Sequence, residues 1–236
     1  MVFVVSGGRL RISGLTISLN EDGSLSTSNP KVEMGFDLWP YWLDIAADHA
    51  ETALSHASDL GRLSGQEMPQ AALLADECRA GMVSIAASAF ALDSFYDAVS
   101  SQRDMGGFNR KWAAARTPRH SRITELLHQT FAVGNPEGKD LARMIREIFT
   151  LRDRAVHPSG EFEAPVRHPL ITPAVPWPYL AFNAANARQA LLNVAGVMYY
   201  CMKHPRRTFP AIVTWSEGAA AEAEPRFARL RVMKDT

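Results

Sequence analysis

The spacing of apolar residues changes near Leu38, and this change constrains the fold more than any other feature of the chain. Between Leu10 and Leu19, apolar and polar residues nearly alternate, a spacing typical of strands. Asp22-Gly23 offers a turn, and Val2–Val5 is a second short apolar run. After Leu38, apolar residues return every three or four positions, as they do in helices. We therefore predict a mainly α protein with a small N-terminal β element.

The β-rich segment, residues 1–38, is too short to bury a core of its own, so we expect it to pack on the helices that follow. Residues 39–67 should hold a connecting helix. Residues 68–204 should form an antiparallel bundle of four or five helices, because short connections favour antiparallel neighbours. The apolar stripes place the bundle helices at about residues 69–100, 121–133, 137–156 and 180–203.

Turn-forming residues and local composition predict the remaining segments. Residues 101–120 contain a Gly-Gly pair and a proline, which predicts a loop, and Ser121 is then a suitable N-cap for the next helix. Residues 158–179 hold six prolines, which predicts a long loop. In the C-terminal tail, residues 205–236, the apolar run Ala211–Trp215 predicts a short strand.

Charge and cysteine content narrow the class of protein. Lys and Arg total 25 and Asp and Glu total 25, so no net charge attracts the whole chain to nucleic acid or to a membrane. Cys78 and Cys201 lie in apolar helical stretches and are predicted to be reduced and buried. Residues 1–8 carry no basic leader, and the longest apolar helix contains several Asn residues. We therefore expect a cytoplasmic protein without a signal peptide or membrane span.

The stretch from Ile145 to Pro158 carries the strongest functional signal. At 3.6 residues per turn, Arg152 lies within about 20° of Ile145 and so continues an apolar stripe of its helix. A guanidinium in that position cannot lose its proton and must be paired or open onto a polar cleft. His157 comes five residues after Arg152, and the following Pro158 forces His157 out of the helical conformation. Such a forced helix end can turn His157 toward the face that carries Arg152.

The residues Arg152-Asp153-Arg154-Ala155-Val156-His157, at the end of a bundle helix and before Pro158, resemble the signature of the HEPN family of helical domains. The resemblance covers about residues 68–204. It implies a four-helix bundle, usually dimeric, which is a metal-independent endoribonuclease in many members. Other members only bind, or support a nucleotidyltransferase partner. Arg122 and His128 have similar spacing, but they lie within a predicted helix and lack the polar second residue.

For an active member, the resemblance implies a role for each residue of the motif. His157 would be the general acid or base for attack by the ribose 2′-hydroxyl, since a histidine exchanges protons in both directions near neutrality. Arg152 would stabilise the charge that develops on the scissile phosphate. Asp153 would orient the histidine or pair with Arg152. No metal or other cofactor is expected, because the substrate itself supplies the nucleophile.

A basic run around a tryptophan is a second candidate site. Its cations would follow an RNA backbone while the indole stacks on a base. The alternative interpretation is a solvated loop. Asp93 and Asp97 lie one helical turn apart and either accept Arg152 across the bundle or face water. The members of the basic run are Arg110, Lys111, Trp112, Arg116, Arg119 and Arg122.

Two functions remain open from the sequence. The first is a metal-independent endoribonuclease, a toxin or defence effector, that acts on RNA as a homodimer and has an antitoxin as its partner. The second is a non-catalytic binding module that acts with a partner protein or a small ligand. The chain contains no Walker loop, no dinucleotide-binding glycine motif, no HExxH and no GxSxG motif. Nucleotide-fold enzymes and serine hydrolases are therefore disfavoured.

Overall fold

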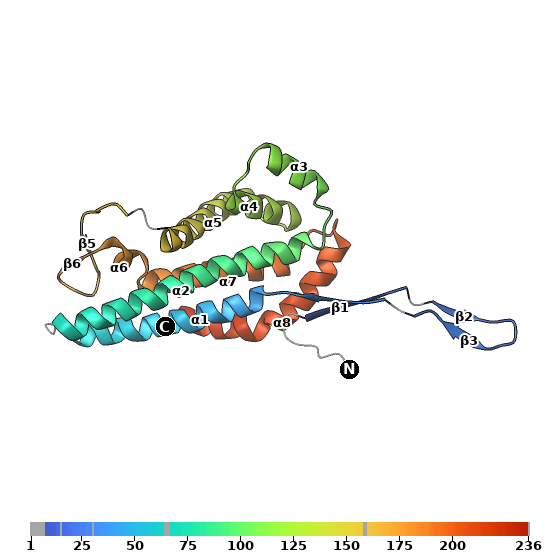
Figure 1. The fold of residues 1–236 in the computed structure, drawn as a ribbon, viewed down its shortest axis with the longest axis horizontal. Helices are drawn as coiled ribbons and strands as arrows, with labels where there is room; N and C mark the ends of the chain where they lie inside the picture. The colour runs from blue at the N-terminus through green and yellow to red at the C-terminus, as the bar shows by residue number, and fades with distance from the viewer. Residues whose placement is uncertain (1–7, 15, 30, 64–66, 158–159, 236) are drawn as a thin grey trace.

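A computed structural model describes residues 8–14, 16–29, 31–63, 67–157 and 160–235 of the chain, so the predicted strand at Val2–Val5 lies outside the described residues. The protein is mainly helical, as predicted, and its strands form small antiparallel pairs (Figure 1). The helices are α1 (Trp39–Arg62), α2 (Glu67–Ser100), α3 (Gly106–Ala114), α4 (Arg119–Thr130), α5 (Asn135–Val156), α6 (Trp177–Ala181), α7 (Ala184–Lys203) and α8 (Pro210–Asp235).

Helix α2 is the central helix of the molecule and contacts α1, α4, α5 and α7. Its side chains are buried on opposite faces, as at Ile85 on one side and Ala87 and Ala91 on the other. Helix α1 runs antiparallel to α2 along most of its length (Figure 1), and Trp39 of α1 packs edge-on against Phe95. Helix α1, predicted as a connector, therefore belongs to the same hydrophobic core as the bundle.

Gly81 lets the start of α7 approach the middle of α2. A Cβ atom at Gly81 would lie 1.9 Å from the carbonyl oxygen of Phe182, a separation that no side chain allows. One turn earlier, the buried Glu77 accepts a hydrogen bond at 2.8 Å from the backbone N–H of Ala184, the first residue of α7. A carboxylate there satisfies a free N–H of the helix end and faces its positive dipole. Helix α2 therefore continues through Gly81, and α7 packs against it at this residue.

The N-terminal strands form a long two-part arm. Strand β1 (Gly8–Ser13) pairs with β4 (Lys31–Phe36), and β2 (Ile17–Leu19) pairs with β3 (Leu25–Thr27). The arm projects away from the helices (Figure 1), and every residue of β2 and β3 is exposed. The prediction that this segment packs on the helices is wrong for its outer part, because α8 already contacts α1 and α7.

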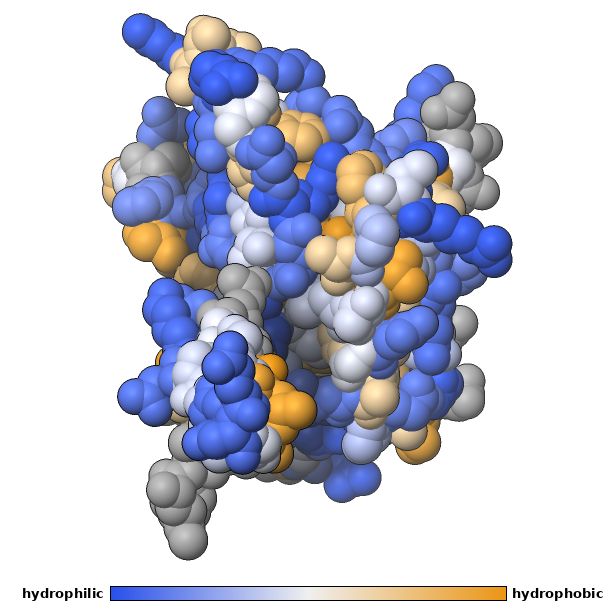
Figure 2. All heavy atoms as spheres, turned by 90° about the vertical axis from the view of Figure 1, so that its right-hand side faces the viewer, coloured by the Kyte–Doolittle hydropathy of each residue, from blue (hydrophilic) through white to orange (hydrophobic). Residues whose placement is uncertain are grey.

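The base of the arm is nevertheless attached to the bundle. Arg9 of β1 forms an ion pair at 2.7 Å with the buried Asp37, which also accepts a hydrogen bond from the indole of Trp215. Figure 2 shows the end of the molecule from which the arm projects, where apolar side chains lie among a mainly hydrophilic surface. The exposed apolar residues of the arm include Ile17, Leu19, Leu25, Val32, Met34 and Phe36.

The C-terminal tail is a helix, so the predicted strand at Ala211–Trp215 is wrong. Those residues begin α8, whose buried side chains recur at helical spacing and pack in the main core. The short run contains Ile212 and Val213, which favour strands locally, but packing against α7 decides the conformation. The buried residues of α8 are Ile212, Trp215, Ser216, Ala219, Ala220, Ala223, Phe227, Leu230 and Met233.

Two boundaries in the middle of the chain also differ from prediction. Residues 106–114 form α3 inside the predicted loop, because Trp112 buries its side chain completely in the core. Helix α4 begins at Arg119 after Pro118, an extended residue, so Ser121 lies within the helix and is not its N-cap. Pro118 restricts the backbone angle φ before the first helical turn, but its side chain accepts no hydrogen bond from that turn.

The proline-rich stretch between α5 and α7 is a structured loop. Strands β5 (Val166–Arg167) and β6 (Ala174–Val175) pair in it, and α6 follows. Arg154 of α5 holds the loop from outside, with its guanidinium 3.7 Å from the ring centre of Trp177 and an ion pair to Glu163. His168 holds it from inside, since its side chain is buried against Glu77. The loop therefore covers the first half of α2.

One described helix, Met68–Ser100, is long and apolar enough to cross a membrane by length and composition alone. Its most apolar window is 61% buried inside the molecule, which is also how the core helix of a bundle looks. Cys78 and Cys201 are both free thiols, as predicted. Cys201 is fully buried, and Cys78 is half-buried.

Candidate site at the end of helix α5

Arg152 lies at the edge of the core with its guanidinium fixed in place. The α5 stripe of Ile145, Ile148 and Phe149 is buried, and Arg152 continues it with a side chain that is 21% exposed. Its guanidinium carbon lies 4.4 Å from the ring centre of Phe149. The Nη2 and Nε atoms donate to one oxygen of Asp153, at 2.6 and 3.0 Å. The aromatic face and the carboxylate together hold a cation whose outer edge meets solvent.

His157 ends α5 and presents an exposed side chain. Its backbone has φ −126° and ψ 72°, outside the helical region, as the following proline predicts. The backbone N–H donates to the carbonyl oxygen of Asp153 at 2.7 Å, which closes the last turn. His157 is thus the C-cap of α5 through its backbone, and its imidazole is left for other interactions.

The motif residues are near one another along the helix but form no closed site within one chain. Asp153 pairs with Arg152, one of the two roles open from the sequence. Within the described part of the chain, no hydrogen bond or ion pair joins Asp153 to the imidazole of His157. Asp93 and Asp97 do not accept Arg152, because both bind Arg119 of α4. The hollows between α4 and α5 and between α7 and α8 are lined by other residues.

The predicted basic run is not a stacking platform. Trp112 is fully buried, and its indole N–H donates to Oε2 of Glu125 at 2.8 Å. Lys111 pairs with the other oxygen of Glu125 at 2.6 Å. Burial alone would raise the pKa of Glu125, but the hydrogen bonds from Lys111 and Trp112 outweigh it and hold that pKa below its ordinary value. These two predicted RNA-binding residues instead attach α3 to α4.

The arginines of the run divide into two groups. Arg119 bridges Asp93 and Asp97 and lies over the ring of Tyr96, so it joins α4 to α2. Arg122 donates through Nε to the carbonyl oxygen of Thr117 at 2.6 Å and orders the turn before α4. Arg110 and Arg116 are exposed, and only these two keep the solvated position that RNA binding would need.

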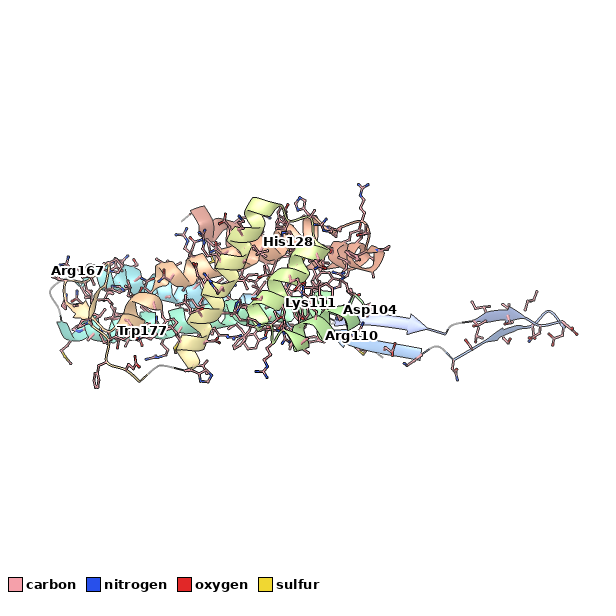
Figure 3. All side chains as sticks on the ribbon, turned by 90° about the horizontal axis from the view of Figure 1, so that it is seen from above. Asp104, Arg110, Lys111, His128, Arg167 and Trp177 are labelled. Carbon is pink, nitrogen blue, oxygen red and sulfur yellow. The ribbon has the colours of Figure 1, made fainter. Side chains whose placement is uncertain are left out.

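The basic run and the end of α5 lie in different parts of the molecule. Arg110 and Lys111 are near the base of the arm (Figure 3). Trp177, which Arg154 of the motif helix contacts, lies at the opposite end of the helical body. A strand of RNA at Arg152 would therefore leave the basic run far away.

Sequence reasoning missed a groove between α4 and α5. It has a volume of about 630 Å³, and basic side chains line both of its walls. His120 and His128 lie two turns apart on α4, and Lys139, Arg143 and Arg146 follow one another on α5. The i, i+4, i+8 spacing of His120, Thr124 and His128 is visible in the sequence and could have indicated one face of a helix.

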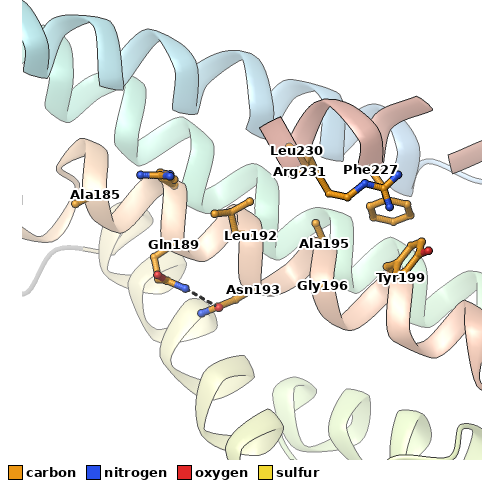
Figure 4. A pocket seen from close by; sticks show the side chains of 11 residues that line it. Ala185, Gln189, Leu192, Asn193, Ala195, Gly196, Tyr199, Phe227, Leu230 and Arg231 are labelled. Atoms are coloured by element: carbon orange, nitrogen blue, oxygen red, sulfur yellow. Dashed lines mark hydrogen bonds between the residues drawn. The ribbon is translucent and has the colours of Figure 1, made fainter. Parts of the chain in front are cut away.

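A second hollow, of about 710 Å³, lies between α7 and α8 (Figure 4). Its wall mixes apolar and polar groups: Tyr199 packs edge-on against Phe227, and Gln189 donates to Asn193. Arg231 at its rim is held by Glu224. Arg188 and Arg231 are the charged residues of this hollow, and none of the residues that line it belongs to the motif at the end of α5.

Among the described residues, no group of three or more His, Cys, Asp or Glu side chains is placed to hold a metal ion. The fold and the site together define a helical-bundle protein with a projecting β arm and an Arg-His pair at one helix end. No protein-family model, curated protein or solved structure matches the chain.

Proposed function

We propose that this chain is a HEPN-type helical-bundle protein that cuts RNA without a metal ion, in the cytoplasm and as a homodimer. The proposal rests on the fixed guanidinium of Arg152 and the exposed imidazole of His157. Arg152 is a cation held by Phe149 and Asp153, and it lies about 7 Å along the helix axis from His157, whose imidazole is exposed.

The proposed reaction uses the substrate's own nucleophile. His157 accepts the proton of a ribose 2′-hydroxyl, and the resulting oxygen attacks the adjacent phosphorus. The bond from phosphorus to the 5′-oxygen breaks, and that oxygen takes a proton from water, while the imidazolium of His157 returns its proton to solvent. The products are a 2′,3′-cyclic phosphate and a 5′-hydroxyl. Arg152 stabilises the extra negative charge on the phosphoryl oxygens, for which a planar, always protonated guanidinium is well suited.

A second copy would supply what one chain lacks. Arg152 and His157 form no cleft alone, and the surface around them carries the exposed apolar residues Val156 and Phe162. Two copies that bury this surface would bring two Arg-His pairs together and exclude water between them. A closed site of this kind strengthens the interaction between a guanidinium and a phosphate.

The alternative function is a non-catalytic HEPN-like binding module that acts with a partner protein. The specific observation in its favour is the C-cap role of His157, which together with the Arg152–Asp153 pair accounts for both residues structurally. If Arg152 and His157 only stabilise the end of α5, the protein would bind its partner without cutting RNA.

Cleavage of labelled RNA and of an all-deoxy copy, with EDTA present, separates these functions. We expect cutting of the RNA alone, with cyclic phosphate ends. The substitution His157→Ala should lower the rate by about 10²–10⁴. Arg152→Lys keeps the charge but loses the planar fork, and it should lower the rate strongly as well. Equal cutting of the DNA copy, or full activity in His157→Ala, would overturn the mechanism.

The chain contains a matched control for each substitution. His204 is the exposed C-cap of α7 with nearly the same backbone angles as His157, so His204→Ala is the control for His157→Ala. The His204 ring also stacks on Tyr200, a contact that the substitution removes. Arg154 is paired with a carboxylate and lies over an aromatic ring, as Arg152 does, so Arg154→Lys is the control for Arg152→Lys. Both control variants should cut RNA at the wild-type rate.

A further inference from the structure

We propose that the groove between α4 and α5 binds the sugar-phosphate backbone of a single-stranded nucleic acid. This site is separate from the Arg152–His157 pair, and it requires no cleavage. A polar face of α4 and a basic face of α5 border a hollow of about 630 Å³.

The charge of the groove selects an anion. Three cations, Lys139, Arg143 and Arg146, line the α5 wall, and Glu125 is the one carboxylate among the lining residues. Glu125 is already neutralised by Lys111 at 2.6 Å, which lies outside the groove lining. Among the cations, Arg143 shares its charge with Asp140 at 2.9 Å. Lys139 and Arg146 are exposed, and neither forms an ion pair with a carboxylate among the described residues.

The shape of the groove fits a chain of phosphates. His120 and His128 are eight residues apart on α4, a separation of about 12 Å along the helix. At about 3.4 Å per phosphate, the spacing in a duplex strand and a lower bound for a single strand, that length spans at most about four phosphates. Imidazole and hydroxyl donors on α4 face guanidinium and ammonium donors on α5, and these are the groups that contact phosphate and sugar oxygens.

The lining also indicates how the strand is recognised. No Phe, Tyr or Trp residue lines the groove, and Ala142 is its one apolar member, so no large ring platform for bases and no hydrophobic anchor is available. An acidic protein partner would need an apolar centre to form a stable interface. Binding should therefore be independent of sequence, dominated by electrostatics and strongly dependent on salt.

The test measures binding of a labelled oligothymidylate of about twelve nucleotides, with a salt series between roughly 50 and 200 mM. This probe has no 2′-hydroxyl, so it cannot be cut by the proposed reaction, and failure of the two proposals remains distinguishable. With three cations, the slope of log affinity against log salt should be about −2, or roughly a twentyfold loss across the series.

Two double variants of equal charge locate the site. Lys139→Ala with Arg146→Ala should weaken binding at least about tenfold at low salt and bring the slope to about −0.7. Arg62→Ala with Arg167→Ala removes two exposed cations that lie outside the groove and outside the basic run, and it should change the affinity less than about twofold. Thermal unfolding at the wild-type temperature for both variants would show that the fold is retained.

Several results would overturn the proposal. These are absence of binding at low salt, a salt-independent affinity, or equal weakening by the two double variants. An oligoglutamate of the same length that competes as well as the oligonucleotide would also overturn it, because the groove would then recognise an acidic polypeptide.

Discussion

The imidazole of His168 faces the carboxylate of Glu77, with Nε2 of His168 at 3.5 Å from Oε2 of Glu77. Both side chains are buried, at 0% and 2% exposure. Nδ1 of His168 accepts the backbone N–H of Leu170 at 3.3 Å, so the proton of a neutral ring lies on Nε2. Nε2 of His168 and Oε2 of Glu77 are close but form no hydrogen bond with each other. The pair joins the proline-rich loop to α2 and, through Glu77, to the start of α7.

We predict that this pair makes stability depend on pH in two opposite directions. Burial lowers the pKa of His168 below its ordinary value of 6.5, so its contribution is present above that value and is lost as pH falls. Burial raises the pKa of Glu77 above its ordinary value of 4.5, despite the Ala184 N–H and His56, so its contribution is lost as pH rises. Urea unfolding across pH measures both effects.

Single substitutions separate the two contributions. His168→Gln should remove part of the loss of stability on acidification below pH 6.5. Glu77→Gln should remove part of the loss as pH rises from 4.5. Unchanged pH profiles in both variants would show that the pair does not titrate differently in the folded and unfolded states.

We predict that Gly81→Ala destabilises the protein although alanine favours helices. The new methyl group would lie 1.9 Å from the carbonyl oxygen of Phe182 and would force α7 away from α2. The expected cost is about 1–3 kcal/mol of unfolding free energy. Gly196 of α7 is the matched control, because a Cβ there meets nothing within 4 Å, and Gly196→Ala should stabilise by about 0.5–1 kcal/mol. Equal effects of the two changes would contradict the close approach.

We predict that Trp112→Phe lowers stability without lowering affinity for nucleic acid. The indole is buried and donates to Glu125, so phenylalanine leaves that carboxylate without one donor at a cost of about 1–3 kcal/mol. Chemical unfolding and oligonucleotide binding should be measured on the same sample. Weaker binding at unchanged stability would restore the stacking role that the sequence suggested.

We predict a homodimer whose interface includes the surface around the end of α5. Val156 is 60% exposed and Phe162 is fully exposed, so a charge at either position should be tolerated by the fold but not by an apolar interface. Val156→Glu and Phe162→Glu should each shift sedimentation from dimer to monomer. Leu25→Glu, on the exposed arm, should leave the dimer intact. Dissociation by the arm variant alone would place the interface on the arm.

Much of the fold could be read from local patterns. Helices α1, α2, α5 and α7 were predicted because each carries an apolar stripe at helical spacing, and β1 because its residues alternate. The out-of-helix conformation of His157 was predicted because a proline restricts the residue before it. These features depend on residues within a few positions of one another.

The candidate site was predicted only in part, because a sequence pattern reports on residues within a few positions of one another. The sequence placed Arg152 beside the core, and the structure adds that Phe149 and Asp153 fix its guanidinium. Spacing could not assign Asp93 and Asp97 to Arg119, since that choice depends on how α4 lies across α2.

The sequence by itself determined where most helices lie, which cysteines are thiols in apolar surroundings, and that a cation and an imidazole share one helix end. Only the tertiary structure decided that Trp112 is buried, that residues 210–235 are helical, that the β arm projects, and that α4 and α5 enclose a basic groove. The physical reason is that backbone preference and apolar period act over a few residues, whereas burial and charge pairing depend on helices distant in the chain.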